Sequence, residues 1–150
     1  MAGAFRASLG LLSFFAALKA PSAAPRSVSS AAPSSSPSGG ATPLPDHVRP
    51  TSLAAFERDV VEASRQQPVI VDFWASWCGP CRTLAPILEN VARAFAGRAR
   101  VIKVDTDAEQ QLAARFQIRS IPTVILFRDG KPASQFTGVQ PEQAIRDWVT

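Results

Sequence analysis

The stretch from Val69 to Arg82, VIVDFWASWCGPCR, decides how this 150-residue chain folds. It opens with Val69 to Trp74, a run of mainly β-branched and aromatic residues that has the composition of a buried strand. After it, apolar residues recur three and four positions apart as far as Phe95, which is the spacing of an amphipathic helix. The two cysteines, Cys78 and Cys81, are therefore expected where a strand ends and a helix begins.

This placement favours thiol chemistry at Cys78. The first turn of a helix has unpaired N–H groups and a partial positive charge, so it stabilises a thiolate there. Gly79 allows a tight turn, and Pro80 fits the first helical turn, where a missing N–H group costs nothing. Cys81 follows one helical turn later, close enough to form a disulfide with Cys78.

Length and composition predict one globular domain, and they argue against two classes of function. The chain is long enough for a single core, and its formal net charge is +4. From Asp46 onward, 13 basic residues stand against 12 acidic ones without a basic stripe, which argues against nucleic-acid binding. Two cysteines and the single histidine, His47, cannot complete a tetrahedral metal site in one chain.

Residues 1–45 differ in composition from the rest of the chain. They contain 11 Ala, 10 Ser and 6 Pro, with three basic residues and no acidic one. Because this composition is typical of a transit peptide, we interpret residues 1–45 as a presequence with a low-complexity extension, and we expect a mitochondrial protein. A plastid presequence, a secretory signal around Ala7 to Leu18 and a disordered tail on a cytoplasmic protein remain open. Ala7 to Leu18 is too short to span a membrane.

The remaining residues alternate between strand and helix patterns. The segment from Leu44 to Pro50 is expected to be an irregular lead-in to a helix that Thr51 or Ser52 caps and that ends before Pro68. Further strands are expected at residues 100–105, 123–127 and 133–137, and helices at residues 82–96, at residues 107–116 with Asp107 as the cap, and from Pro141 onward. This order predicts an α/β fold with a central mixed β-sheet flanked by helices on both faces.

A carboxylate in the middle of the apolar strand is the second candidate site residue. Asp72 lies six residues before Cys78 and has apolar neighbours on both sides, so we expect it to be buried with a raised pKa. Its expected role is to exchange a proton with Cys81. Lys103 lies in another apolar run, where it either pairs with Asp72 or faces solvent.

The motif Trp77-Cys78-Gly79-Pro80-Cys81, after a strand that carries Asp72, resembles the active site of the thioredoxin family. The resemblance covers residues 51–150, and we expect a thioredoxin domain over residues 46–150. It implies a protein-disulfide reductase in cell redox homeostasis, with Cys78 as the nucleophile and Cys81 as the resolving thiol. The Cys78–Cys81 disulfide would be its redox centre, with no bound cofactor or metal. The bacterial thioredoxin 2 type looks most similar, although its cysteine-rich zinc module is absent here.

The same resemblance implies roles for residues around the cysteines. Pro122 corresponds to a proline that follows a cis peptide bond in the family, so we expect the Ile121–Pro122 bond to be cis. Ile121, Pro122 and Gly138 would form a substrate groove, and Lys103 would tune Asp72. Three motif residues would add to the apolar surface around the sulfur atoms: Trp77, Gly79 and Pro80.

The expected partners are disulfide-containing proteins and a thioredoxin reductase that uses NADPH or, in a plastid, ferredoxin. The protein is expected to be a monomer that binds neither nucleic acid nor a membrane. An oxidase or isomerase of the same fold is an alternative, although oxidising relatives commonly carry His where this chain has Gly79-Pro80. A non-catalytic docking subunit is a second alternative, which the intact Cys78, Cys81 and Asp72 disfavour.

Overall fold

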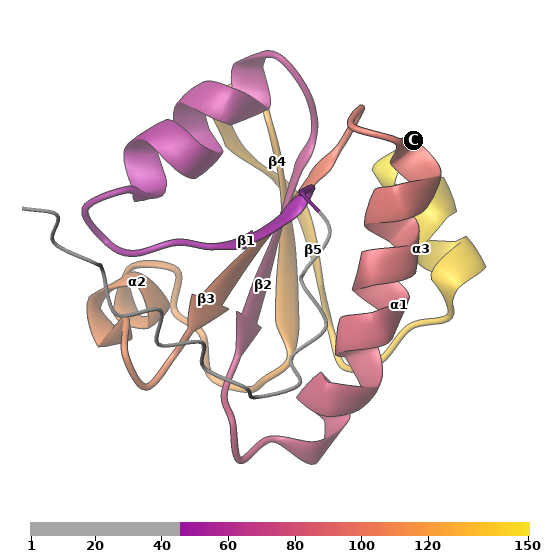
Figure 1. Ribbon diagram of the computed structural model, residues 1–150. Coiled ribbons are helices and arrows are strands. Elements are labelled where there is room, and N and C mark those ends of the chain that lie inside the picture. The colour runs from indigo at the N-terminus through magenta and orange to yellow at the C-terminus, as the bar shows by residue number, and fades with distance from the viewer. Residues whose placement is uncertain (1–45) are drawn as a thin grey trace, which may run out of the picture. The chain divides into compact units, whose positions relative to one another are not determined.

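The structure, a computed structural model, describes residues 46–150, and the expected presequence lies outside this part. The described residues form a five-stranded mixed sheet with the order β1-β3-β2-β4-β5 (Figure 1). The first three of these strands are parallel, and the last two are antiparallel to their neighbours. The strands are β1 (Val48–Pro50), β2 (Val69–Trp74), β3 (Arg100–Asp105), β4 (Thr123–Arg128) and β5 (Lys131–Thr137).

Helices cover both faces of this sheet, which confirms the predicted α/β fold (Figure 1). One face carries α1 (Gly79–Phe95) and α3 (Glu142–Val149). The other face carries α2 (Gln110–Arg115) and a helical segment made of η1 (Glu57–Glu62) and η2 (Ala63–Arg65). Pro86 lies inside α1 without ending it.

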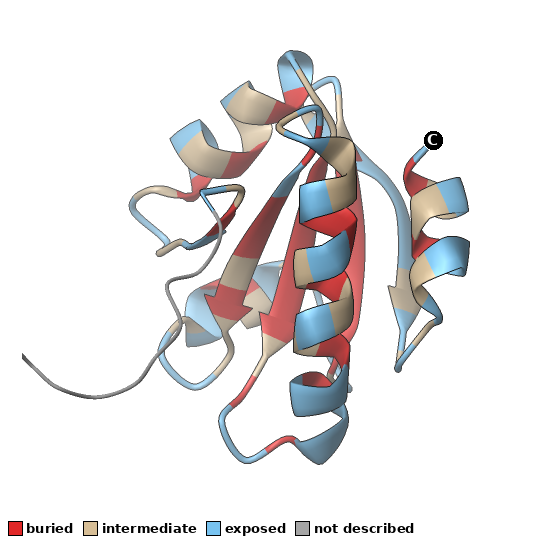
Figure 2. Cartoon of the chain, turned by 45° about the vertical axis from the view of Figure 1, so that its right-hand side comes forward, coloured by how far each residue is buried: buried red, intermediate tan, exposed pale blue. Residues whose placement is uncertain are grey.

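The central strands of the sheet are coloured as buried in Figure 2, and β2 is buried along nearly its whole length. Because successive side chains of a strand point to opposite faces, β2 contributes to the core on both faces. Ile70 packs with apolar residues of α1 and α3, including Leu84 and Ile145. Val71 and Phe73 point to the opposite face and pack with apolar residues of η1 and α2. Because both faces are covered, β2 reads as a continuous apolar run that only Asp72 interrupts.

The start of the described region differs from the expectation. Val48–Pro50 is not irregular but forms β1, which pairs in parallel with β3. The helical segment begins at Glu57, well after Thr51 and Ser52, and its first part is π-helical. The Thr51 hydroxyl donates to the Asp59 carboxylate at 2.8 Å and does not cap the helix, whose N-cap residue is Phe56.

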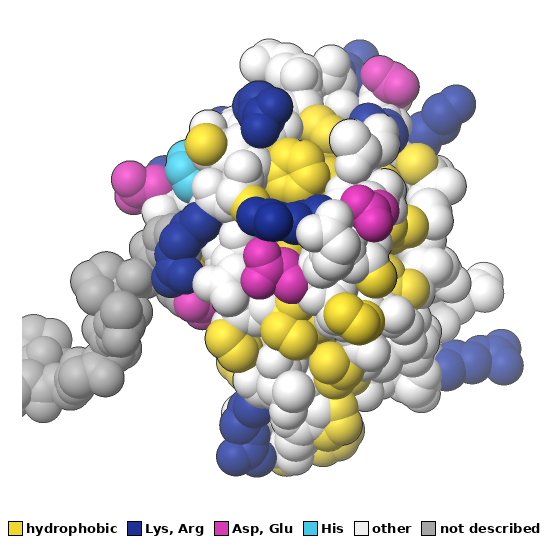
Figure 3. Space-filling view, turned by 90° about the vertical axis from the view of Figure 1, so that its right-hand side faces the viewer, with side chains coloured by type: hydrophobic (Ala, Val, Ile, Leu, Met, Phe, Trp, Pro, Cys, Tyr) yellow, Lys and Arg dark blue, Asp and Glu magenta, His cyan; other side chains and the backbone are white. Residues whose placement is uncertain are grey.

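Charged side chains stand among hydrophobic ones on the face that carries α1 and α3 (Figure 3). Two ion pairs of this face join residues one helical turn apart, Arg93 with Glu89 on α1 and Arg146 with Glu142 on α3. Such exposed pairs contribute little to stability, so this face depends on its apolar contacts with the sheet. In the part of the chain that the structure describes, no helix is both long and apolar enough to cross a bilayer.

The α1–sheet contact can be tested with Leu84→Ala. Leu84 is fully buried, so its truncation should leave a cavity and lower the free energy of unfolding by about 2–5 kcal/mol. Urea denaturation followed by circular dichroism measures this difference. The matched control is Leu53→Ala, because Leu53 is 42% exposed and should change stability by less than about 0.5 kcal/mol. Equal losses in the two variants would contradict this account of the core.

Candidate active site

Three segments meet at one edge of the sheet because of strand direction and register. The parallel strands β2 and β3 pair Trp74 with Asp105, so the segments that follow them leave side by side (Figure 1). The antiparallel strand β4 pairs Thr123 with Phe73, so the segment before β4 arrives at the same edge. These segments bring together Cys78, Asp107 and Ile121.

Cys78 and Cys81 are joined by a disulfide at the start of α1, with their Cα atoms 5.3 Å apart. Cys78 is the N-cap residue of the helix, and the Cys81 backbone N–H donates to the Cys78 Sγ at 3.2 Å. The unpaired N–H groups and the positive end of the helix dipole are thus directed at the Cys78 sulfur. This arrangement favours negative charge on that atom when the disulfide is reduced.

Both cysteines are less exposed than their position at a helix start suggests. Cys78 is 4% exposed and Cys81 is 3% exposed. The reason is that Trp74 and Ile121 pack against the pair. These two side chains therefore cover most of the surface of the disulfide.

The segment before β4 is in contact with the disulfide. The Ile121–Pro122 peptide bond is cis, which confirms the expectation. The Ile121 carbonyl oxygen lies 3.8 Å from the Cys78 Sγ. Gly138, at a φ of 88° that favours glycine, donates its backbone N–H to the Pro122 carbonyl at 2.8 Å. This bond ties the end of β5 to the start of β4 beside the reacting sulfur atoms.

Asp72 is 1% exposed and lies on the sheet face that α1 covers, the same face as Ile70. Burial raises the pKa of its carboxyl group, and the positive charge of Lys103 opposes this shift. The Lys103 Nζ lies 3.4 Å from the Asp72 Oδ2, and it also lies 5.0 Å from the centre of the Trp74 ring. Neither carboxylate oxygen receives a hydrogen bond from the described residues, so this carboxyl group remains available to hold a proton.

Trp77 forms one wall of a groove beside the disulfide. Its side chain is 66% exposed, and its indole Nε1 donates to the Asp107 Oδ2 at 3.0 Å. The groove has a volume of about 330 Å³. Its lining consists of Trp77, Thr106, Ala113, Ile118, Arg119, Ser120 and Ile121.

The groove includes only some of the residues that the sequence singled out. Trp77 and Ile121 line it, whereas Pro122 and Gly138 are joined to each other and are not part of its lining. Gly79 and Pro80 are exposed at the start of α1. They too lie outside the lining of this groove, although they adjoin the cysteines.

Sequence reasoning missed the contribution of the segment after β3. Asp107 was expected to cap α2, but that helix begins at Gln110 and the Asp107 carboxylate accepts from Trp77. The sequence carries no periodic signal for such a contact, because residue 107 lies thirty positions from its partner. The only available clue was that two adjacent parallel strands place their following segments side by side.

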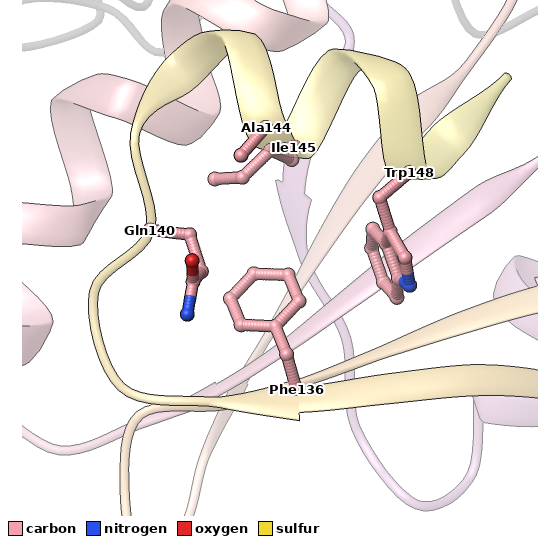
Figure 4. A pocket seen from close by; sticks show the side chains of 5 residues that line it. All are labelled: Phe136, Gln140, Ala144, Ile145 and Trp148. Carbon is pink, nitrogen blue, oxygen red and sulfur yellow. The ribbon is translucent and has the colours of Figure 1, made fainter.

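A second hollow lies between β5 and α3, away from the disulfide. Figure 4 shows its walls, and its volume is about 290 Å³. It is lined by Phe136, Gln140, Ala144, Ile145 and Trp148. None of these side chains is a nucleophile, an acid or a base, so the hollow is not a site for thiol chemistry. Among residues 46–150, no group of three or more His, Cys, Asp or Glu side chains is placed to hold a metal ion.

Comparisons with known proteins agree with this geometry. The sequence model of the thioredoxin family matches residues 47–150. Thioredoxin of Staphylococcus saprophyticus is 45% identical over 80 residues, which is 53% of this chain and 77% of the relative. Thioredoxin 1 of Synechococcus elongatus is 41% identical over 92 residues, 61% of this chain and 84% of the relative. Thioredoxin of Rickettsia felis is 36% identical over 96 residues, 64% of this chain and 90% of the relative.

The raised pKa of Asp72 predicts how the stability of the protein depends on pH. Above pH 3.8, the usual pKa of this carboxyl group, the unfolded chain has released the proton, whereas the folded protein holds it up to its own, higher pKa. The free energy of unfolding should therefore fall as the pH rises between these two pKa values. Asp72→Asn removes the titration and should therefore be more stable than the wild type at neutral pH. Urea denaturation of both oxidised proteins between about pH 4 and about pH 8 measures the difference, which should shrink toward the acid end. A constant difference across this range would contradict the prediction.

Proposed function

Since this chain belongs to the thioredoxin family of thiol–disulfide oxidoreductases, it is a protein-disulfide reductase, and we propose how its residues divide the reaction. The observation that carries the proposal is the position of Cys78 at the start of α1, where the Cys81 N–H donates to its sulfur. We assign Cys78 the role of nucleophile, because the helix N-terminus stabilises its thiolate. Cys81 is the resolving thiol.

The exchange proceeds in two displacements. The Cys78 thiolate attacks a substrate disulfide, forms a mixed disulfide with one substrate sulfur and releases the other as a thiolate. The Cys81 thiolate then attacks the Cys78 sulfur, which restores the Cys78–Cys81 disulfide and releases the second substrate sulfur. Two electrons pass from the two cysteines to the substrate, and the protein ends in the oxidised form seen in the structure.

Asp72 supplies the proton acceptor that the second displacement needs. Cys81 must lose its proton before it attacks, and Asp72 lies under α1 on the same side of the sheet. A buried carboxyl group that receives no hydrogen bond from the described residues is more stable neutral than ionised, so Asp72 can accept this proton. Lys103, at 3.4 Å, limits how far the pKa of Asp72 rises and so keeps this carboxyl group able to release the proton again.

An extended peptide that carries the substrate disulfide binds along the segment before β4. Trp77 and Ile121 provide apolar contacts beside the sulfur atoms, and the Ile121 backbone offers hydrogen bonds in the manner of an added strand. Gly138, at the adjoining end of β5, supports this segment by donating its backbone N–H to the Pro122 carbonyl oxygen. The partners are thus proteins with accessible disulfides, which the monomer binds transiently.

The oxidised protein must be reduced again after each turnover. We assign this step to a thioredoxin reductase that draws electrons from NADPH, or from ferredoxin if the protein resides in a plastid. The acid-free, Ser-rich composition of residues 1–45 supports a presequence and favours the mitochondrion.

The roles of the two cysteines can be separated by single substitutions. Cys78→Ser should abolish reduction of insulin disulfides, because the attacking thiolate is lost. Cys81→Ser should accumulate a covalent mixed disulfide with the substrate, because nothing resolves it. Non-reducing gel electrophoresis and the rate of insulin precipitation in the presence of dithiothreitol measure both effects. The reverse pattern would exchange the two roles, and full activity in Cys78→Ser would reject the proposal.

The presequence proposal has its own test. Residues 1–45 fused to a fluorescent protein should carry it into mitochondria, and the imported fusion should be shortened. Fluorescence microscopy with organelle markers and immunoblotting measure location and cleavage. The matched control replaces Arg6, Lys19 and Arg26 with Gln, which removes the positive charge of the segment and should leave the fusion in the cytosol. Accumulation of the unmodified fusion in the cytosol or in the secretory pathway would contradict a mitochondrial presequence.

A further inference from the structure

A short turn after β3 is closed by one side chain. Asp105, the last residue of β3, accepts from two backbone N–H groups through its Oδ1 atom. The N–H group of Asp107 lies at 2.9 Å and that of Ala108 at 3.4 Å. Because both donors belong to the next three residues, the Asp105 side chain determines where the backbone at residue 107 points.

The same turn is attached to the end of β2. The Thr106 backbone N–H and hydroxyl group both donate to the Trp74 carbonyl oxygen, at 2.9 Å and 3.1 Å. Thr106 also lines the groove beside the disulfide. The turn is therefore fixed to the segment that precedes the cysteines. The Asp105 side chain fixes its far end at Asp107 and Ala108, and two further bonds support this end: the Gln110 side chain donates to the Asp107 carbonyl at 3.3 Å, and the Glu109 N–H donates to the Asp105 carbonyl at 2.8 Å.

The Asp107 carboxylate links this turn to the Trp77 side chain. Its Oδ2 accepts from the Trp77 indole Nε1 at 3.0 Å. At 66% exposure, Trp77 has few packing contacts to define its orientation, so this hydrogen bond has a large share in placing the ring. A displaced Asp107 would release a groove wall directly beside Cys78.

We propose that Asp105 is a positioning residue for disulfide exchange, because it orients Trp77 through Asp107. This inference rests on the proposed function, since Trp77 matters only if the groove beside Cys78 receives a substrate. Asp105 acts as a hydrogen-bond acceptor and not as a charge, because both of its contacts are to neutral backbone N–H groups. Its loss should weaken substrate binding and leave the sulfur chemistry of Cys78 and Cys81 intact.

The test compares Asp105→Ala, which removes the acceptor, with Asp105→Asn, which retains an acceptor oxygen in the same place. The first readout is the indole N–H resonance of Trp77 in ¹⁵N-labelled protein, assigned by comparison with Trp77→Phe. In Asp105→Ala this resonance should broaden and move to its position in Asp107→Ala, whereas in Asp105→Asn it should stay at its wild-type position. The chain has three tryptophans, and Trp148, which lies on α3 away from this turn, serves as the internal reference.

The second readout is steady-state reduction of a protein disulfide. In Asp105→Ala the KM should rise about fivefold, the ratio that corresponds to one hydrogen bond, with kcat within about twofold of the wild type. Asp105→Asn should restore the KM. The matched control is Asp147→Ala, which removes an exposed carboxylate of α3 that accepts from Gln143 and should change neither readout.

An unchanged Trp77 resonance in Asp105→Ala would overturn the proposal. So would an Asp105→Asn protein that behaves like Asp105→Ala, or an Asp105→Ala protein whose kcat falls while its KM is unchanged. If Asp105→Ala does not fold, Asp105→Ser provides a weaker acceptor and should fall between Asp105→Asn and Asp107→Ala in both readouts. Equal values in Asp105→Ser and Asp105→Asn would then overturn it. A wild-type protein that reduces no protein disulfide would reject the proposed function instead, and the indole resonances would still decide whether Asp105 orients Trp77.

Discussion

The register between three strands is the constraint on which the reacting groups depend. β2 pairs in parallel with β3 and antiparallel with β4, so the segment after β2, the segment after β3 and the segment before β4 all reach the same edge. A slip of one residue in either pairing would turn the side chains of β2 to the opposite faces. Asp72 would then leave the face under α1, and Ile121 would move away from Cys78. The covered faces of the sheet prevent such a slip, because it would place Asp72 among the apolar residues of the other core.

The central strand of the same sheet contains one residue, Asp72, whose burial lowers the stability of the fold. A buried carboxylate with a single cation at 3.4 Å and no hydrogen bond from the described residues is unfavourable when ionised, and the apolar neighbours of β2 compensate through their own burial. Lys103 reaches Asp72 because the two residues are register partners on adjacent strands. This loss of stability is consistent with the role of proton acceptor that we propose for Asp72, because perturbed pKa values cluster at functional sites.

The sequence predicted the parts of this structure that depend on local pattern. Val69–Trp74 and Arg100–Asp105 match the expected strands because their apolar runs are bounded by turn residues and proline. The cis bond at Pro122 followed from the family resemblance, since sequence alone would favour trans. The lead-in at Val48–Pro50 was missed because so short an edge strand has no periodicity of its own. Asp107 was misjudged because an acidic residue before a helix usually caps it, and here a distant indole competes for the carboxylate.

The two sides of the site are held by different physical means. The sulfur atoms and Asp72 are buried, so packing on both faces of the sheet holds them. The groove wall formed by Trp77 is exposed, so packing does little there and specific hydrogen bonds must hold it. Those bonds come from the turn after β3, which is itself attached to the end of β2 through Trp74. The two supports meet at Ile121, which lines the groove and also packs against the cysteines. The Trp77 side of the groove can therefore change its shape with less effect on the packing around the sulfur atoms than the Ile121 side can.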